Sequence, residues 1–303
     1  MTTRTAVLAA TRRPAWQLVA GGLGAGLLGL LPWLITGLRL PLQNLWAAEV
    51  MPEEMPLALL PFNQYALTLL LGMLVWGPAV AGLLARRAPL ESRGRAASFA
   101  ALGTLLVTGA ATAQSAVVVS DGLRPDDPRA DLYLGGVLAV IVGSVAVGLG
   151  VLILLARAPR AAASAGATVA ALAGGIWLNA LIVPFGDVAS AVQIAVLGYA
   201  RWVPAVLVGA ALVWCGTGGV GKVAAWLVDL ALLWMVPAAL TAVSHAAGSR
   251  VLAGDLEEMG AVAVEVFFQA VGPAGVTLEY VLLAAAIGVV GSLARVLARR
   301  RPS

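Results

Sequence analysis

The chain has 303 residues, of which 61% are hydrophobic and 11% are charged. Soluble domains carry roughly 25% charged residues, so this chain has more apolar surface than a water-soluble fold can bury. Lipid is therefore its expected surroundings. A single cysteine, Cys215, and a single histidine, His245, exclude a disulfide framework and multi-histidine metal sites, and we expect no cofactor.

The net charge of +4 and the pI near 9.8 could suggest nucleic-acid binding. The basic residues do not form a patch, however. They lie at the ends of hydrophobic runs, which is typical of membrane topology signals. We therefore expect membrane lipids as partners and no nucleic acid.

Eight hydrophobic runs follow one another along the chain. A helix that crosses ~30 Å of hydrocarbon needs ~20 mostly apolar residues, and each run approaches or exceeds that length. The sequence predicts one all-α domain over residues 1–303, a polytopic transmembrane helix bundle of about eight helices. The predicted spans are residues 16–38, 65–84, 97–119, 132–155, 165–183, 194–215, 223–243 and 276–297.

The first run, residues 16–38, follows Arg12 and Arg13, as the apolar part of a signal peptide would. It is longer than the ~7–15 apolar residues of a signal, and no convincing small-residue cleavage site follows it. We therefore interpret it as a membrane span.

Most of the 19 basic residues lie in connections on the same side as the N-terminus. Because positive charge is retained in the cytoplasm, this predicts a plasma (inner) membrane protein with both termini cytoplasmic. The residues are Arg4, Arg12, Arg13, Arg86, Arg87, Arg93, Arg95, Arg157, Arg160, Lys222, Arg295, Arg299, Arg300 and Arg301.

The opposite connections are longer and carry most of the acidic residues, so a protein partner could dock there. Residues 46–60 are interpreted as an extracytoplasmic lid or a short surface helix. Residues 255–270 have apolar residues at helical spacing and predict a short interfacial helix. Asp255 and Glu258 would form its capping box.

A weak internal repeat is indicated by similar residues in the two halves. Pro61-Phe62 follows the first outer connection, Pro184-Phe185 opens the third, and Tyr133 and Tyr280 each begin the last span of their half. These matches predict a four-plus-four parallel duplication.

Two glycine-rich segments resemble nucleotide-binding motifs. Gly24–Gly29 fits a dinucleotide pattern but lies inside a span, where Gly22/Gly26 and Gly21/Ala25/Gly29 spacing favours close helix packing. Residues 216–223 resemble a P-loop, yet Val223 stands where a Ser or Thr should hold magnesium. We interpret that segment as a turn and expect no nucleotide.

Asp229 is the most informative single residue. It lies seven residues beyond Lys222, roughly 10 Å into the seventh span at ~1.5 Å per residue. A carboxylate near a span centre costs ~2.5–3.5 kcal/mol. It could bind a proton, a cation or a positive substrate. Equally, the Asp229 side chain could be a structural partner for a neighbouring hydrogen-bond donor, or it could reach the cytoplasmic interface.

Four further residues are candidates for substrate or ion binding. Arg201, near the outer boundary, could hold a phosphate or carboxylate, with Glu279 or Asp187 as partners at the same depth; the alternative is snorkelling to the headgroups. Gln114 and Asn179 are interpreted as buried amides, which helix-to-helix hydrogen bonds would also explain.

Three functions remain open from the sequence. The first is a transporter or permease-like subunit for a lipid or small apolar substrate. The second is a non-catalytic subunit that docks a partner through its acidic outer loops. The third is an intramembrane enzyme acting on a lipid-linked substrate with Glu53, Glu54 or Asp126 as acid or base, although no paired motif selects a catalytic residue.

Overall fold

The computed structural model describes residues 13–249, 256–272 and 277–300. Within these ranges the chain is a bundle of α-helices without β-strands, and eight helical segments are long and apolar enough to cross a membrane. The predicted all-α architecture is confirmed, and the chain is a multi-pass membrane protein.

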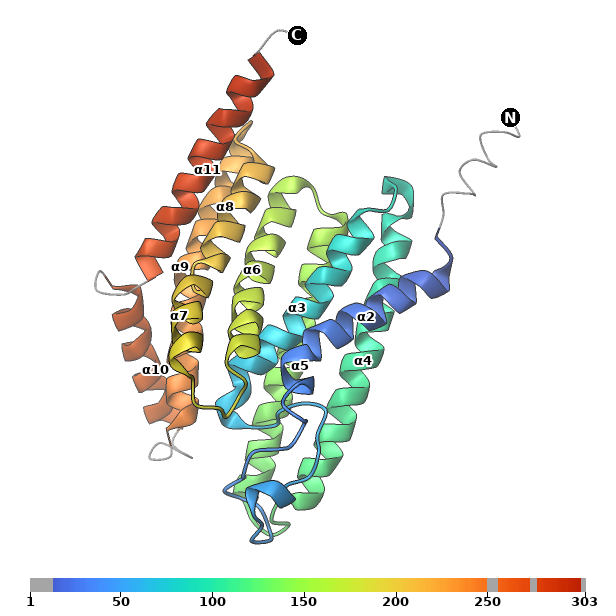
Figure 1. The fold of residues 1–303 in the computed structure, drawn as a ribbon, viewed down its shortest axis with the longest axis vertical. Helices are drawn as coiled ribbons and strands as arrows, with labels where there is room; N and C mark the ends of the chain where they lie inside the picture. Colours follow the sequence, from blue (N-terminus) through green and yellow to red (C-terminus); the bar gives the residue numbers. More distant parts are fainter. Residues whose placement is uncertain (1–12, 250–255, 273–276, 301–303) are drawn as a thin grey trace.

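The eight spans occur where the sequence predicts them, and the sixth consists of two helices (Figure 1). The first four spans are α2 (Ala15–Leu34), α3 (Leu67–Arg86), α4 (Arg93–Gly122) and α5 (Pro128–Arg157). The others are α6 (Arg160–Ile182), α7 (Ala191–Ala200) with α8 (Val203–Cys215), α9 (Val220–Gly248) and α11 (Thr277–Arg300).

The helices pack as two groups of four spans that meet at α6. In the first group α2 packs on α3 and α4, and α3 packs on α5. In the second group α6 packs on α8 and α9, and α8 packs on α11. In both groups the first span packs on the second and the third, and the second packs on the fourth. A duplication would produce this correspondence, and the four-plus-four repeat stays a prediction. Helix α6 also packs on α3 and α5 and so joins the groups.

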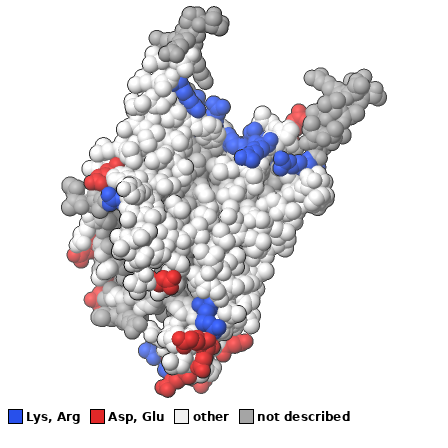
Figure 2. All heavy atoms as spheres, viewed as in Figure 1, with Lys and Arg blue, Asp and Glu red and all other residues white. Residues whose placement is uncertain are grey.

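The two ends of the bundle differ in charge. Figure 2 shows Lys and Arg across the upper end of the visible face and most of the Asp and Glu at the lower end. We call the upper end, where α3 and α5 end and α4 and α6 begin, the arginine-rich end, and the other the acidic end. The positive-inside rule predicts that the arginine-rich end faces the cytoplasm.

Glycines on α2 allow close backbone contact with α3 and α4. A Cβ atom at Gly22 would lie 2.2 Å from the carbonyl oxygen of Ala100, and one at Gly29 would lie 2.6 Å from a backbone oxygen of α3. Gly26 is buried as well. The predicted packing role is confirmed for these three glycines and is wrong for Gly21, which has open space around its Cβ position.

The connection between α8 and α9 is a tight turn, as predicted for the P-loop-like segment. Gly216 and Gly219 have φ angles of +77° and +114°, which favour glycine. The indole of Trp226 donates a hydrogen bond of 3.1 Å to the Gly216 carbonyl, which fixes the turn against α9.

The connection between α2 and α3 folds over the acidic ends of α4 and α5. Met55 and Phe62 are fully buried there, and Trp33 Nε1 donates a 2.8 Å hydrogen bond to the carbonyl of Ala58. The predicted lid over residues 46–60 is therefore a packed cap. Its regular structure is one 3₁₀ turn, Pro52–Glu54.

The predicted amphipathic helix near residue 255 is α10 (Leu256–Val271), which packs along α9 (Figure 1). Asp255, predicted to cap this helix, lies outside the described residues. Figure 1 shows α11 beginning part of the way along the bundle, beyond the upper end of α10.

Candidate functional site

Asp229 belongs to a buried stripe on α9. Ala225, Asp229 and Leu233 recur every four residues and are all buried. Residues four apart lie on one face of a helix, and α9 packs on α6. The helical register that buries the two apolar residues therefore also places the carboxyl inside the bundle.

The carboxyl of Asp229 faces two hydroxyl groups on α6. Asp229, Ser164 and Thr168 are each 0% exposed, and the two hydroxyls are the polar neighbours of the carboxyl. Ser164 donates its hydrogen bond to the Ala161 carbonyl of its own helix, at 2.8 Å. Neither oxygen of Asp229 nor the Thr168 hydroxyl makes a hydrogen bond with good geometry to any described residue. We call these three residues the carboxyl–hydroxyl cluster.

No described Lys, Arg or His comes within 4.0 Å of the Asp229 carboxylate. Asp229 is nine residues from Val220, so the carboxyl lies about 14 Å along α9 from its arginine-rich end. A bare carboxylate at that depth is costly. A proton or a small cation would remove this cost, because carboxylate and hydroxyl oxygens are ligands that hard cations prefer.

The two hydroxyl residues were not singled out from the sequence. Ser164 and Thr168 are four residues apart in a segment otherwise made of alanine and glycine, so they share one helix face. That spacing was the available signal. The contact with Asp229 depends on the packing of α6 against α9, which no local pattern shows.

Arg201 lies at an interruption of the sixth span. Helix α7 ends at Ala200 and α8 begins at Val203, and Pro204 in the first turn of α8 has no N–H to continue the hydrogen-bond ladder. The Arg201 side chain is exposed, and its guanidinium lies 4.9 Å from the centroid of the Trp202 ring.

The interruption lies against the beginning of α11. The rings of Trp202 and Tyr280 meet edge to face with centroids 5.1 Å apart, so Arg201 and Glu279 each adjoin a member of this aromatic pair. Glu279 is exposed. Neither Glu279 nor Asp187 forms an ion pair with Arg201 within 4.0 Å in the described part of the chain.

Gln114 fastens the cap to α4. Its Oε1 accepts a 2.9 Å hydrogen bond from the backbone N–H of Leu59, and its Nε2 donates a 3.0 Å bond to the carbonyl of Leu57. Ser115 accepts a 2.8 Å bond from the N–H of Leu60. The partners of Gln114 are therefore loop backbone groups rather than another helix.

Asn179 is exposed, so its prediction as a buried amide is wrong. The neighbouring Trp177 points into the bundle, where its Nε1 donates a 3.0 Å hydrogen bond to the carbonyl of Leu28. Two residues along an α-helix correspond to a rotation of about 200°. Asn179 consequently faces away from the bundle.

Replacing Gln114 by leucine should loosen the cap. The change leaves the partly buried N–H of Leu59 without its partner, at a cost of up to ~1–3 kcal/mol, whereas the exposed carbonyl of Leu57 can bind water instead. We expect faster protease cleavage between residues 40 and 60 in the purified protein. Ser120→Ala, an exposed change on the same helix, is the control and should cleave at the wild-type rate; equal rates for all three proteins would contradict the fastening role.

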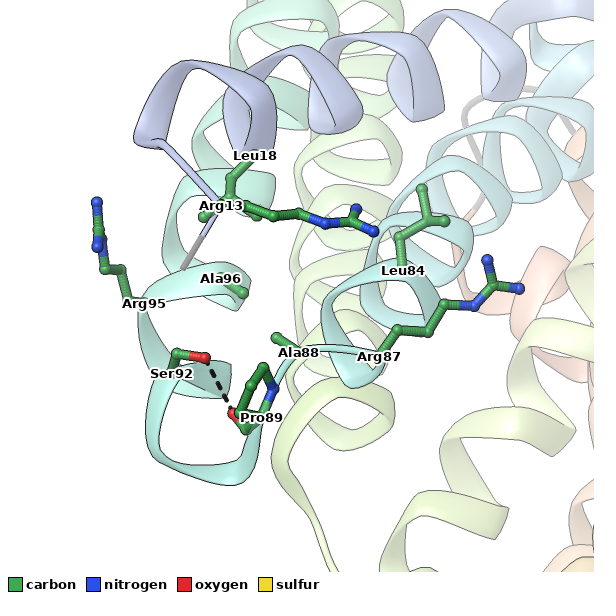
Figure 3. Close-up of a pocket in the computed structure, with 9 residues that line it drawn as sticks. All are labelled: Arg13, Leu18, Leu84, Arg87, Ala88, Pro89, Ser92, Arg95 and Ala96. Carbon is green, nitrogen blue, oxygen red and sulfur yellow. Dashed lines mark hydrogen bonds between the residues drawn. The ribbon is translucent and has the colours of Figure 1, made fainter. Parts of the chain in front are cut away.

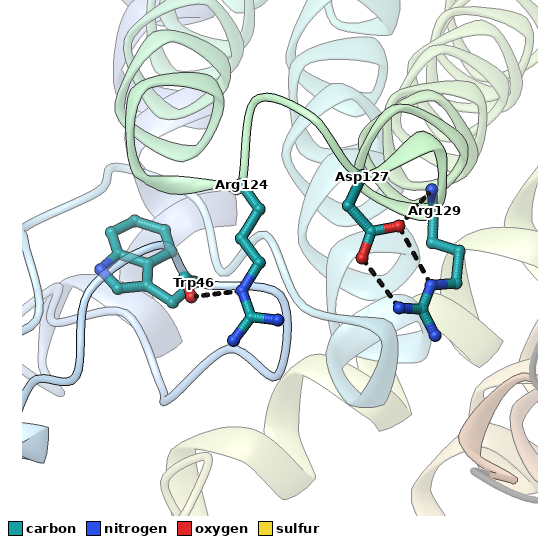
Figure 4. Close-up of polar contacts among 4 residues, drawn as sticks. All are labelled: Trp46, Arg124, Asp127 and Arg129. Carbon is teal, nitrogen blue, oxygen red and sulfur yellow. Dashed lines mark hydrogen bonds and ion pairs between the residues drawn. The ribbon is translucent and has the colours of Figure 1, made fainter.

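Carboxylates and arginines at the acidic end hold the connection between α4 and α5 (Figure 4). Asp127 caps α5 by accepting a 3.0 Å hydrogen bond from the backbone N–H of Arg129, and its side chain pairs with the Arg129 guanidinium at 2.9 Å. These hydrogen bonds lower the pKa of Asp127. Arg124 donates a 3.3 Å bond to the Trp46 carbonyl, which ties the cap to the same turn.

No protein-family model matches the chain, and neither a curated protein nor a solved structure does. Function is therefore inferred from the chemistry of the sites, because similar folds support unrelated functions. Of the five residues predicted to bind a substrate or ion, Asp229 combines full burial with unsatisfied polar atoms. Arg201 and Glu279 lie on neighbouring elements, Gln114 is engaged by the cap, and Asn179 faces outward.

Proposed function

We propose that the protein is a permease-like membrane subunit for a lipid or small apolar substrate, driven by a proton or small cation that binds the carboxyl–hydroxyl cluster. One observation carries this proposal: Asp229 is fully buried inside a membrane bundle, and neither of its oxygens makes a hydrogen bond of good geometry within the described part of the chain. Ionisable groups inside spans are expensive, and in membrane proteins they mark ion paths and proton relays.

The position of the cluster supports coupling between an ion and a movement of helices. The cluster lies between α6 and α9, and α6 also packs on α3 and α5 of the other group. An ion that binds or leaves the α6–α9 interface therefore acts on the helix that joins the two groups. Rocking of one helix group against another is a common form of alternating access.

The interrupted sixth span supports the same function. Helices α7 and α8 both pack on α6, and Arg201 lies at their junction. Transporters frequently place substrate or ion sites at discontinuous helices, because the interruption frees backbone groups within the membrane. Arg201 would bind an anionic group of the substrate, with its guanidinium held over Trp202.

A shallow, open apolar groove on the surface suits such a substrate. The groove has a volume of about 410 Å³ and lies between α8 and α11. Its lining residues carry no charge, as a lipid chain or another apolar molecule would require. They are Val213, Ala286, Ile287, Val290 and Gly291.

The test uses purified protein in liposomes that contain a pH-sensitive dye, with a membrane potential imposed by potassium and valinomycin. Wild-type protein should change the internal pH, and Asp229→Asn should abolish the change. Asp121→Asn is the matched control, because Asp121 is exposed at the acidic end of α4 and should retain the wild-type rate. Two results would contradict a proton as the driving ion. One is wild-type protein that moves no protons, and the other is an Asp229→Asn variant that moves them at the wild-type rate.

A second function is favoured by the exposed acids of the cap, Glu49, Glu53 and Glu54. They would dock a basic protein partner, with the bundle acting as its membrane anchor. Combined replacement of the three by glutamine should then release a co-purifying protein without changing proton movement. A partner that stays bound to the triple variant excludes these acids as the docking site.

A further inference from the structure

A small cavity opens at the arginine-rich end of the first helix group (Figure 3). Its volume is about 240 Å³, and it lies between the beginning of α2, the end of α3 and the beginning of α4. Leu18, Leu84 and Ala96 give it an apolar side. Three arginines, Arg13, Arg87 and Arg95, also line it, so the cavity combines apolar walls with positive charge.

One of the three arginines, Arg13, reaches across the cavity, and Arg87 lines its edge. Figure 3 shows Arg13 extending toward Leu84, whereas the side chains of Arg87 and Arg95 leave the lining in opposite directions. The guanidinium of Arg95 instead lies 5.6 Å from the centroid of the Phe99 ring. Arg13 and Arg87 are exposed and form no ion pair within the described ranges. Their ten N–H donors are therefore available, at about five for each guanidinium.

The surroundings of the cavity are positive as well. Arg93, at the beginning of α4, adds a further positive charge between the lining residues Ser92 and Arg95 in the chain. The acid in the connection from α3 to α4 is Glu91, whose side chain is exposed. Little negative charge from the protein itself offsets the arginines here.

We propose that this cavity binds the phosphate of an anionic ligand through Arg13 and Arg87. A guanidinium matches a phosphate with two parallel hydrogen bonds, which Arg13 would supply first. The exposed side chain of Arg87 would rotate toward the bound phosphate and add a second guanidinium. The cavity lies at the ends of three spans, where lipid headgroups lie, and its apolar side suits the glycerol and first chain carbons of a lipid. The phosphodiester of an anionic lipid is therefore the favoured source over free phosphate.

The test measures the thermal unfolding midpoint of the detergent-solubilised full chain. The additions are phosphatidylglycerol, phosphatidylcholine or inorganic phosphate, each in separate samples. Phosphatidylglycerol should raise the midpoint of the wild type, because a ligand that binds the folded state stabilises it. The combined variant Arg13→Gln/Arg87→Gln should lose most of that rise. Arg160→Gln removes one charge from the same end without touching the cavity and should retain the rise.

The additions distinguish the source of the phosphate. A rise with phosphatidylglycerol alone, lost in the double variant, supports a lipid, and a rise with inorganic phosphate, lost in the same way, supports a free anion. The inference is overturned by no rise with either probe, by an equal rise in the double variant, or by an equal loss in Arg160→Gln. Should the glutamine variant fail to fold, Arg13→Lys/Arg87→Lys keeps the charge and should lose part of the rise, since lysine cannot bind phosphate bidentately.

Discussion

Gly103→Leu should prevent the bundle from assembling, whereas Gly109→Leu on the same helix should be tolerated. A Cβ atom at Gly103 would lie 2.3 Å from the carbonyl oxygen of Val19 and 2.6 Å from the backbone nitrogen of Leu23. At Gly109 no described atom of another helix lies within 4 Å of the Cβ position. The obstacle at Gly103 is backbone, so α2 and α4 would have to move apart.

The expected size of this effect follows from two opposing terms. Replacing a helical glycine normally gains up to about 1 kcal/mol. Overpacking of a core side chain costs ~1–3 kcal/mol, and a clash with rigid backbone exceeds that range. We expect Gly103→Leu to yield little monodisperse protein on size-exclusion chromatography, while Gly109→Leu elutes like the wild type. A normal elution profile and unfolding midpoint for Gly103→Leu would refute the close packing of α2 on α4.

Asp229→Asn should raise the unfolding midpoint of the protein while it abolishes proton movement. The asparagine keeps the shape of the side chain and removes a buried charge that costs ~2.5–3.5 kcal/mol at a span centre. Each kcal/mol corresponds to roughly 2–4 °C in a protein of this size class. The gain in stability and the loss of function would occur together because the unsatisfied carboxyl is kept for its chemistry.

Thr168→Val measures whether the cluster acts as a unit. The buried Thr168 hydroxyl adjoins the Asp229 carboxyl without a hydrogen bond of good geometry among the described residues, so valine alone should change the midpoint little. Combined with Asp229→Asn, Thr168→Val should show an interaction energy of ~0.5 kcal/mol or more, since the stability effects of changes at neighbouring residues do not add.

For Asp229→Asn alone, a fall in the unfolding midpoint would show that the carboxylate is held by structural partners. Asp121→Asn, at an exposed position, should leave the midpoint unchanged.

The spans could be predicted because crossing a membrane is a local property of length and apolarity. The same argument does not fix the rotation of a helix about its own axis. Helix α6 is apolar on most of its faces, so the sequence could not show that Ser164 and Thr168 face α9 while Asn179 faces outward. Asp229 could be found because an acid inside an apolar run is rare, although its neighbours could not.

Long-range packing accounts for the other differences. The cap depends on Gln114 reaching backbone groups more than fifty residues earlier in the chain, which no local pattern encodes. The interruption near Arg201 did have a local signal, because Pro204 removes a hydrogen bond from the span. The arginine-lined cavity is formed by three separate helices, and only their approach brings Arg13 and Arg87 to the same cavity.

The orientation of the bundle decides which sites face the cytoplasm, and cysteine labelling in intact cells tests it directly. Cys215 is 1% exposed, so Cys215→Ser provides a background without reactive thiols. Glu53→Cys and Arg95→Cys would then each add one exposed thiol, at the acidic and the arginine-rich end. A membrane-impermeant maleimide should label Glu53→Cys in intact cells and Arg95→Cys only after permeabilisation. Labelling of Arg95→Cys in intact cells would contradict the predicted orientation, and with it the cytoplasmic placement of the arginine-lined cavity.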